Sequence, residues 1–205
     1  AINESWNGSA WTEVADLNTA RSSLAGGGTT TSALAINGDN PGPAYQAVES
    51  WDGSSWTEIA ETNSGTTQGS AAVASASDGL RFSGYLQPPT AVTGITESWN
   101  GSSWTEVADL NTARSEDAGS AGRSSTDALI FGGYVPATAI ANTEAWNGSA
   151  WTEVNDLSTA VYGPSSGPTG TGKDAINIGG NAPPYVVNVE EWNFPSSPVL
   201  VEGML

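Results

Sequence analysis

The chain repeats one ten-residue phrase, Glu-x-Trp-Asn-Gly-Ser-x-Trp-Thr-Glu, with Asp in place of Asn in the second copy. The copies are separated by 45, 48, 47 and 46 residues, and the last copy is shortened; they begin at Glu4, Glu49, Glu97, Glu144 and Glu190. A steady period in this range is typical of arrays of supersecondary units, each of which buries its apolar face only against its neighbours. The sequence therefore predicts a single repeat domain spanning residues 1–205.

Each repeat is expected to contain four short strands. In the third repeat the segment 115–121 is small and Gly-rich, and 127–131 is apolar and ends in a Gly-Gly doublet. Two further extended segments, 141–146 and 149–154, flank Asn147-Gly148, and Asn-Gly is the strongest short signal for a β-hairpin. No stripe of apolar residues has the 3.6-residue period of a helix, so the fold is predicted to be all-β.

The two Trp residues of each hairpin are predicted to share one face of the sheet. A two-residue turn would pair Trp51 with Ser54, whereas a four-residue turn would pair Trp51 directly with Trp56. Either register places both indoles on the same side, where they suit packing between neighbouring sheets, with a sugar-stacking platform as the alternative. The Trp residues to which we assign this structural role are Trp6, Trp11, Trp51, Trp56, Trp99, Trp104, Trp146, Trp151 and Trp192.

The order of these features resembles the kelch repeat: a Gly doublet, an extended strand, an aromatic residue, a short turn and Trp-Thr-Glu. The match is best from Gly132-Gly133 through Trp146 to Trp151, and the doublet becomes Asn37-Gly38 and Ser83-Gly84 in earlier copies. The repeated phrase also resembles kelch-type arrays in virion appendage proteins of marine and environmental bacteriophages. The resemblance implies a kelch-like β-propeller built from four-stranded antiparallel blades.

The number of blades depends on how the ends of the chain are used. Four complete units span about 18–62, 63–110, 111–157 and 158–205, with 198–202 as a possible last outer strand, and residues 1–17 form an extra hairpin. A propeller of five blades, its ring closed by this hairpin, is the preferred prediction. Four blades remain the alternative, and a start inside a repeat also fits an array that extends beyond this chain.

The composition narrows the possible functions. The 22 acidic and 5 basic residues give a net charge of −17, which disfavours binding to nucleic acid or to an anionic membrane surface. The chain has no cysteine and no histidine, so it lacks thiol catalysis, a Ser-His-Asp triad and the histidine ligands of kelch-like copper oxidases. We expect no cofactor, no metal and no enzymatic activity, with a glycosidase that uses paired carboxylates as the less favoured alternative.

The loops that follow the second strand of each repeat are the candidate binding region. Residues 4–21 and 97–114 differ only at Ala10 and Ser103, whereas these loops differ from one repeat to the next. In kelch-like propellers they lie on the same face as the connections between blades. Tyr and Pro in such loops offer rigid contact area. The candidate binding residues are Asp39, Asn40, Tyr45, Tyr85, Gln87, Tyr134, Asn181 and Tyr185.

The sequence thus predicts a non-catalytic binding or structural display module that contacts a protein or a glycan through one face. Its partners would include other subunits of a virion or appendage, and its location would be extracellular or on a virion surface. The alternatives are a lectin with repeated sugar sites between blades and a purely architectural role. Fold alone does not separate these functions.

Overall fold

The computed structural model describes residues 2–40, 46–86, 91–115, 119–136, 138–166, 173–182, 185, 187 and 189–193. All regular structure in this part of the chain is strand, arranged in several antiparallel sheets, which confirms the predicted all-β class. The described residues contain no helix, and so none that is long and apolar enough to cross a membrane. The predicted strand at 198–202 lies outside the described residues.

Three four-stranded sheets follow one another along the chain, and in each the strands pair in sequence order. The first sheet contains β3 (Ala25–Thr29), β4 (Ser32–Ile36), β5 (Val48–Trp51) and β6 (Trp56–Ile59). The second contains β8 (Ser70–Ser75), β9 (Asp78–Phe82), β12 (Thr96–Trp99) and β13 (Trp104–Glu106). The third contains β14 (Gly119–Ser124), β15 (Asp127–Phe131), β18 (Thr143–Trp146) and β19 (Trp151–Glu153).

Smaller sheets complete the molecule. The fourth sheet contains three described strands, β20 (Ser165–Ser166), β21 (Asp174–Ile178) and β22 (Val189–Asn193), and an N-terminal hairpin contains β1 (Asn3–Trp6) and β2 (Trp11–Val14). Short strands pair in the connecting loops: β7 (Thr66–Thr67), β10 (Tyr85–Leu86), β11 (Ala91–Val92), β16 (Tyr134–Val135) and β17 (Thr138–Ala139). Each large sheet lies within one of the sequence repeats.

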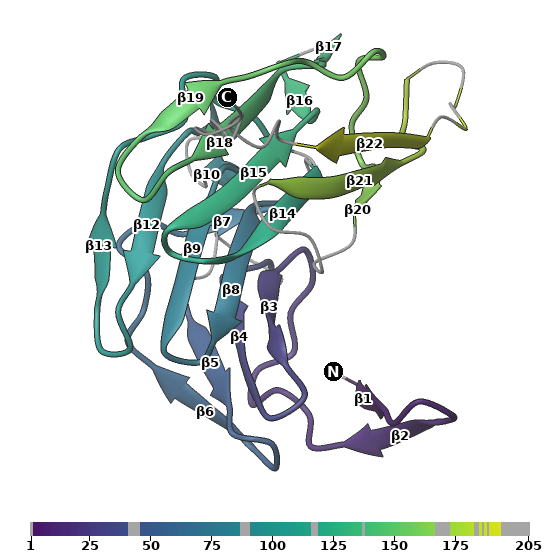
Figure 1. Ribbon diagram of the computed structural model, residues 1–205. Helices are drawn as coiled ribbons and strands as arrows, with labels where there is room; N and C mark the ends of the chain where they lie inside the picture. Colours follow the sequence, from purple (N-terminus) through teal and green to yellow (C-terminus); the bar gives the residue numbers. More distant parts are fainter. Residues whose placement is uncertain are drawn as a thin grey trace, which may run out of the picture.

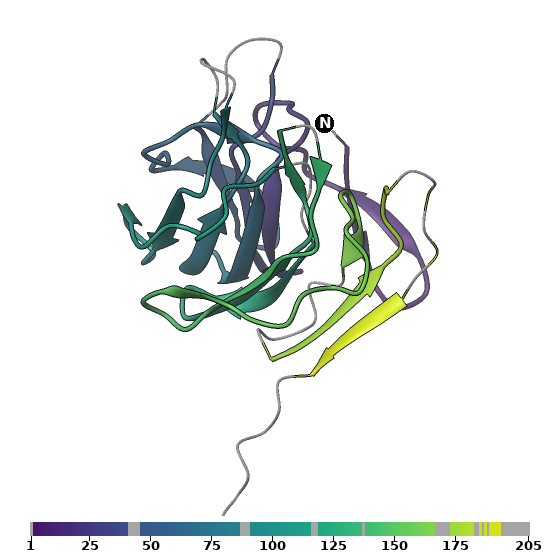
Figure 2. The ribbon, with the colours of Figure 1, turned by 90° about the horizontal axis from the view of Figure 1, so that it is seen from above.

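The sheets are arranged as an open arc (Figure 1). The first strands of successive sheets, β3, β8 and β14, lie next to one another, and β14 also contacts β20. Seen from above, the sheets again follow one another around a curve (Figure 2). The hairpin β1–β2 lies at one end of the arc and the sheet β20–β22 at the other. Among the described strands, β1 and β2 pair only with each other, so the predicted closure of the ring is not seen.

The hairpin turns contain four residues, and this decides between the two registers that the sequence allows. Trp51 is directly opposite Trp56, and the same register recurs in every complete copy, so the two-residue alternative is wrong. The Asp52 carboxylate holds the turn because its Oδ1 accepts the N–H of Ser54 at 2.8 Å and of Ser55 at 2.9 Å. The indoles share a face, with ring centroids 5.3 Å apart.

The Gly doublet marks a left-handed turn that ends the second strand of every repeat. Its first residue has a φ of 64° at Gly132 and 62° at Gly179. Asn37 and Ser83 occupy the equivalent position with φ of 56° and 64°, so the two weaker matches to the doublet adopt the same backbone conformation. Asn is among the few residues that tolerate this region, and Ser83 is fully buried there.

The core lies between successive sheets rather than within one sheet. Leu34, Ile36 and Val48 of the first sheet pack against Trp99 and Trp104 of the second. The second and third sheets repeat this arrangement: Leu80 and Phe82 pack against Trp146 and Trp151. The third and fourth sheets do so with a single Trp, and the residues of that interface are Leu129, Phe131, Ala175 and Trp192. The Trp pairs of the second and third sheets therefore pack against the preceding sheet, so these repeats bury their apolar faces against a neighbour.

Candidate binding face and the clasps that support it

Four of the candidate binding residues occupy equivalent positions, one in each repeat. Asp39 forms an isolated bridge with Ser22, and Tyr85 pairs with Thr67 in the β7–β10 ladder. Tyr134 and Asn181 make the corresponding bridges with Ser115 and Tyr162. In every case the partner belongs to the connection, the segment that leads from the preceding hairpin into the first strand of the sheet. The loop and the connection of each repeat therefore lie side by side. We call the surface formed by Asp39, Tyr85, Tyr134 and Asn181 the loop face.

The loop face presents an aspartate, two tyrosines and an asparagine from the four successive repeats. Asp39 is exposed, whereas Tyr85, Tyr134 and Asn181 are half-buried. Asn40 beside Asp39 is half-buried, and Tyr185 is 82% exposed. Two further candidates, Tyr45 and Gln87, lie outside the described residues.

Tyr162 is a member of this surface that the sequence argument missed. Its ring packs edge-on against Tyr134 with centroids 5.1 Å apart, and its hydroxyl accepts a hydrogen bond from the Asn181 side-chain amide. Tyr162 thus connects the loops of the third and fourth repeats. The sequence does contain a signal for Tyr162: it follows Val161 in the fourth repeat as Ser115 follows Arg114 in the third, and both residues bridge to the loop face.

The inter-sheet Trp residues are closed off from any ligand. Trp99, Trp104, Trp146 and Trp151 are at most 7% exposed. The Nε1–H of Trp151 donates to Thr96 Oγ1 at 3.0 Å, and those of the other three donate to backbone carbonyl oxygens. These indoles fill the core, and a sugar has no access to their faces. Trp56 and Trp192 are half-buried, and the hairpin at the N-terminal end differs most, with Trp6 and Trp11 exposed by 46% and 64%.

A buried carboxylate fastens each connection to the sheet that follows it. In the second repeat, Glu97 Oε2 accepts the backbone N–H of Asn63 at 2.7 Å and its side-chain amide at 2.8 Å. Glu97 Oε1 accepts the N–H of Ser64 at 3.1 Å and forms an ion pair with Arg81. Asn63 Nδ2 also donates to the carbonyl oxygen of Trp104. We call this arrangement of carboxylate, connection and arginine a clasp.

The first and third repeats contain the same clasp. In the first, Asn18 N–H donates to Glu49 Oε2 at 2.8 Å and Arg21 Nη1 to Glu49 Oε1 at 2.5 Å. In the third, Asn111 and Arg114 hold Glu144 in the same way, with an Arg–Glu distance of 2.6 Å. All three pairs are almost completely inaccessible to solvent. The Glu that opens the repeated phrase is therefore a structural residue in these three repeats.

The arginine of the clasp comes from two different places in the chain. Arg21 and Arg114 belong to the connection, three residues after the Asn of the clasp. The second repeat has Thr66 at that position, and its arginine is Arg81 on β9, directly opposite Glu97 on β12. Arg81 Nη1 donates to Thr66 Oγ1 at 3.4 Å. The guanidinium thus reaches the same carboxylate from a neighbouring strand.

The electrostatics of the clasps follow from their burial. Burial lowers the pKa of Arg81, and the Glu97 carboxylate opposes this shift by favouring the charged guanidinium. Burial alone would raise the pKa of Glu49, but hydrogen bonds from Asn18 and Arg21 bring it below its usual value. Each clasp therefore sets a guanidinium and several N–H donors against a buried carboxylate, the condition that makes a buried charge tolerable. Among the described residues, Arg81 Nε is left without a hydrogen-bond partner.

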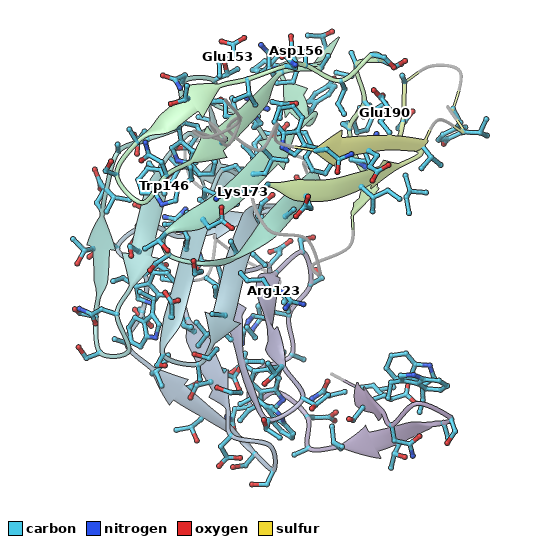
Figure 3. All side chains as sticks on the ribbon, in the orientation of Figure 1. Arg123, Trp146, Glu153, Asp156, Lys173 and Glu190 are labelled. Carbon is cyan, nitrogen blue, oxygen red and sulfur yellow. The ribbon has the colours of Figure 1, made fainter. Side chains whose placement is uncertain are left out.

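The inner strands enclose a second candidate site, a central cavity of about 390 Å³. Gly26, Gly27 and Gly28 of β3 line it together with small residues of β8 and β14. One cation, Arg123 on β14, borders it and is exposed; Figure 3 labels this residue. Backbone groups and one guanidinium could hold an anionic or hydroxyl-rich group, but the described residues contain no group of three His, Cys, Asp or Glu that could hold a metal ion.

No protein-family model and no curated protein sequence matches the chain. Its classification therefore depends on the repeat itself: an array of antiparallel sheets, packed through Trp pairs and fastened by buried carboxylates.

Proposed function

We propose that the chain is a non-catalytic binding and display module that contacts a protein or glycan surface through the loop face. The observation that carries this proposal is the equivalence of Asp39, Tyr85, Tyr134 and Asn181, which place an acid, two tyrosines and an amide at one structural position. Around them, the hairpin phrase and the buried glutamate that opens it recur with few changes in the first three sheets. A frame that is kept while one set of loops varies is the usual arrangement of a recognition surface.

The clasps support this proposal because they fix the connections from which the loop face is built. Asn18 and Asn63 are each bound through backbone and side chain to a buried carboxylate, so the segments that follow them begin from fixed points. Half-buried Tyr rings on such a frame lose little conformational freedom on binding. This is the property expected of a surface that recognises a partner without large rearrangement.

A lectin is the nearest alternative. The buried state of Trp104 and Trp151 argues against repeated sugar sites on the inter-sheet Trp pairs. Sugar stacking on the loop face, on Tyr85 and Tyr134, remains the form of the lectin hypothesis that this surface favours. A glycosidase has no more specific support, since the most regular carboxylates, Glu97 and Glu144, are engaged in clasps.

The test is a binding screen of the whole chain against glycan and protein arrays, with Tyr85→Ala and Tyr134→Ala variants. We expect both substitutions to weaken the same interaction, by about tenfold or more if the rings are anchors. The matched control is Ser103→Ala in a hairpin turn, because the first copy already has Ala10 there. Binding that survives both Tyr substitutions would overturn the loop face as the binding surface.

We further propose that the array is a kelch-like β-propeller of five blades whose ring closes when β1–β2 packs against the fourth sheet. The two ends of the arc carry the complementary halves of the internal interface. The exposed Trp6 and Trp11 correspond to the buried Trp99 and Trp104. In the first sheet, Trp99 and Trp104 cover Leu34, Ile36 and Val48. The equivalent residues of the fourth sheet are Ile176, Ile178 and Val189, and they are exposed.

Closure is tested by comparing Trp11→Ala with Trp104→Ala. Trp104 is buried between sheets, so its truncation should cost about 3–5 kcal/mol of the free energy of unfolding. In a closed ring Trp11 occupies the same environment, and Trp11→Ala should cost a comparable amount. A cost for Trp11→Ala below about 1 kcal/mol would show that the hairpin stays exposed.

The resemblance to appendage arrays of bacteriophages extends the proposal to an extracellular or virion-surface location and to subunits of that assembly as partners. The strongly acidic composition is consistent with a soluble surface element. Isolation of the native assembly, followed by cross-linking and mass spectrometry, tests this directly. Recovery of the chain from a cytoplasmic complex with no particle would contradict it.

A further inference from the structure

The fourth repeat contains a clasp that lacks its arginine. Glu190 Oε2 accepts the backbone N–H of Ser158 at 2.8 Å, as Glu97 does with Asn63 and Glu144 with Asn111. The other oxygen, Oε1, is the atom that binds a guanidinium in the first three repeats. In the fourth repeat this oxygen is buried and has no hydrogen-bond partner among the described residues. The fourth clasp thus keeps one backbone N–H donor to its carboxylate, whereas Ser158 replaces the Asn of the other clasps and the arginine is missing.

Both positions that supply the arginine in other repeats are occupied by neutral residues. Val161 takes the place of Arg114, since it bridges to Ile140 as Arg114 does to Thr93. Asn177 takes the place of Arg81, since it lies opposite Glu190 on the adjacent strand. Asn177 is only 4% exposed, and within the part of the chain that the structure describes its Oδ1 also has no partner. Two hydrogen-bond acceptors on adjacent strands are therefore buried without a donor.

The chain has no other arginine to complete this clasp. Its five basic residues are the three clasp arginines, Arg123 and Lys173. Arg123 is on β14 beside the central cavity, and Lys173 precedes β21, four residues before Asn177. That separation corresponds to about 13 Å along an extended strand. Figure 3 shows Lys173 and Glu190 labelled at opposite ends of the fourth sheet.

A small cavity opens beside the two unsatisfied oxygens, between the third and fourth sheets. Its volume is about 60 Å³, and Asn177 and Glu190 line it together with Asp156 and Glu191. Phe131 and Trp192 supply apolar walls. Carboxylates with apolar flanks suit a planar guanidinium, which is weakly hydrated and combines bidentate hydrogen bonding with stacking on an aromatic face.

We propose that this fourth clasp binds a guanidinium group from outside the chain, namely an arginine side chain of a partner protein. A guanidinium would donate to Glu190 Oε1 and Asn177 Oδ1 and so reproduce the ion pair of the other three repeats. A metal ion fits less well, because Ca²⁺ takes six to eight oxygen ligands and no three His, Cys, Asp or Glu among the described residues, including the three acids of this cavity, are placed to hold one ion. This inference depends on the clasp and not on the loop face.

The test measures thermal unfolding of the whole chain with Nα-acetyl-arginine amide at millimolar concentrations. We expect a saturable rise in Tm of about 2–4 °C at roughly five times the Kd. The matched controls are Nα-acetyl-lysine amide and KCl at the same ionic strength, which should give a smaller rise or none. In Glu190→Gln the rise should disappear.

Two variants supply the missing arginine from the chain itself. Val161→Arg copies the first and third clasps, and Asn177→Arg copies the second. Each should raise the Tm without ligand and abolish the response to the arginine amide; if one fails to fold, the other decides. Equal responses to arginine and lysine amides, a response to Ca²⁺ alone, or an unchanged response in the filled variant would overturn the proposal.

Discussion

At the scale of single residues, the clasp carboxylates are the most consequential side chains outside the apolar core. Glu49, Glu97 and Glu144 are almost fully buried, and each is matched by one guanidinium and by N–H groups of the connection. Replacement of a buried pair by apolar residues is often neutral, whereas removal of one partner leaves an uncompensated charge. The repeat can therefore supply its arginine from either of two positions, and where both are neutral, as in the fourth repeat, a buried carboxylate oxygen is left unpaired among the described residues.

Glu49→Gln tests this at one clasp and has a defined pH dependence. Because the pKa of Glu49 is lowered in the folded state, its ionised form stabilises the fold above the unfolded pKa of about 4.3. That contribution is lost as the pH falls through the lower folded pKa. We expect a loss of about 3–5 kcal/mol for Glu49→Gln at pH 7, shrinking at lower pH. Urea unfolding at pH 7 and below pH 4 measures the difference.

The matched control is Glu58→Gln, since Glu58 lies opposite Glu49 on β6 but is exposed. Its effect should stay within about 0.5 kcal/mol. If the free energy of unfolding of Glu49→Gln differed from that of the unmodified chain by the same amount at all pH values, the assignment of the titration to Glu49 would be contradicted.

At the scale of structural elements, the hairpin is a self-contained unit fixed by its turn. Asn100 Oδ1 accepts the N–H of Ser102 at 2.9 Å and of Ser103 at 3.0 Å, and Gly101 adopts a φ of 93°. We expect Asn100→Ala to cost about 1 kcal/mol, because two turn N–H groups lose their acceptor. Asn100→Asp should be tolerated, since Asp52 performs the same role in the second copy. Denaturant unfolding of both variants separates the outcomes, and equal losses would refute the role of the side-chain oxygen.

The same elements show what the sequence predicts and what it leaves open. The hairpin and the shared face of its Trp residues could be predicted, because Asn-Gly and the two-residue period of a strand require them. The turn length could not, since both registers satisfy that parity and the Asn100 side chain decides between them. The role of Arg81 as the clasp arginine of the second repeat could not be predicted either. Its equivalents in other repeats are Ala35 and Ile130, and only the pairing of β9 with β12 places it opposite Glu97.

At the scale of the whole molecule, the array behaves as a series of similar interfaces with two unlike ends. Each internal interface is formed by a Trp-bearing face and an aliphatic face of the neighbouring sheet. At the ends these faces are exposed separately, on the β1–β2 hairpin and on the β21–β22 pair. Repeat arrays generally need polar caps at exposed ends, and this chain has apolar ones. That mismatch is the physical reason to expect the ends to meet.

A ring and an open array transmit a local change differently, which gives a prediction at this scale. Replacement of Trp6 and Trp11 together by Ala removes the apolar surface of the hairpin. In a closed ring this exposes the far end of the chain, so amide hydrogen exchange should accelerate in β21 and β22. In an open array stability depends on nearest neighbours, and faster exchange would be confined to β1, β2 and the first sheet. We expect the distant response, with the single substitution Ser103→Ala as the unperturbed reference; exchange rates in β21 that match the reference would show that the ends do not meet.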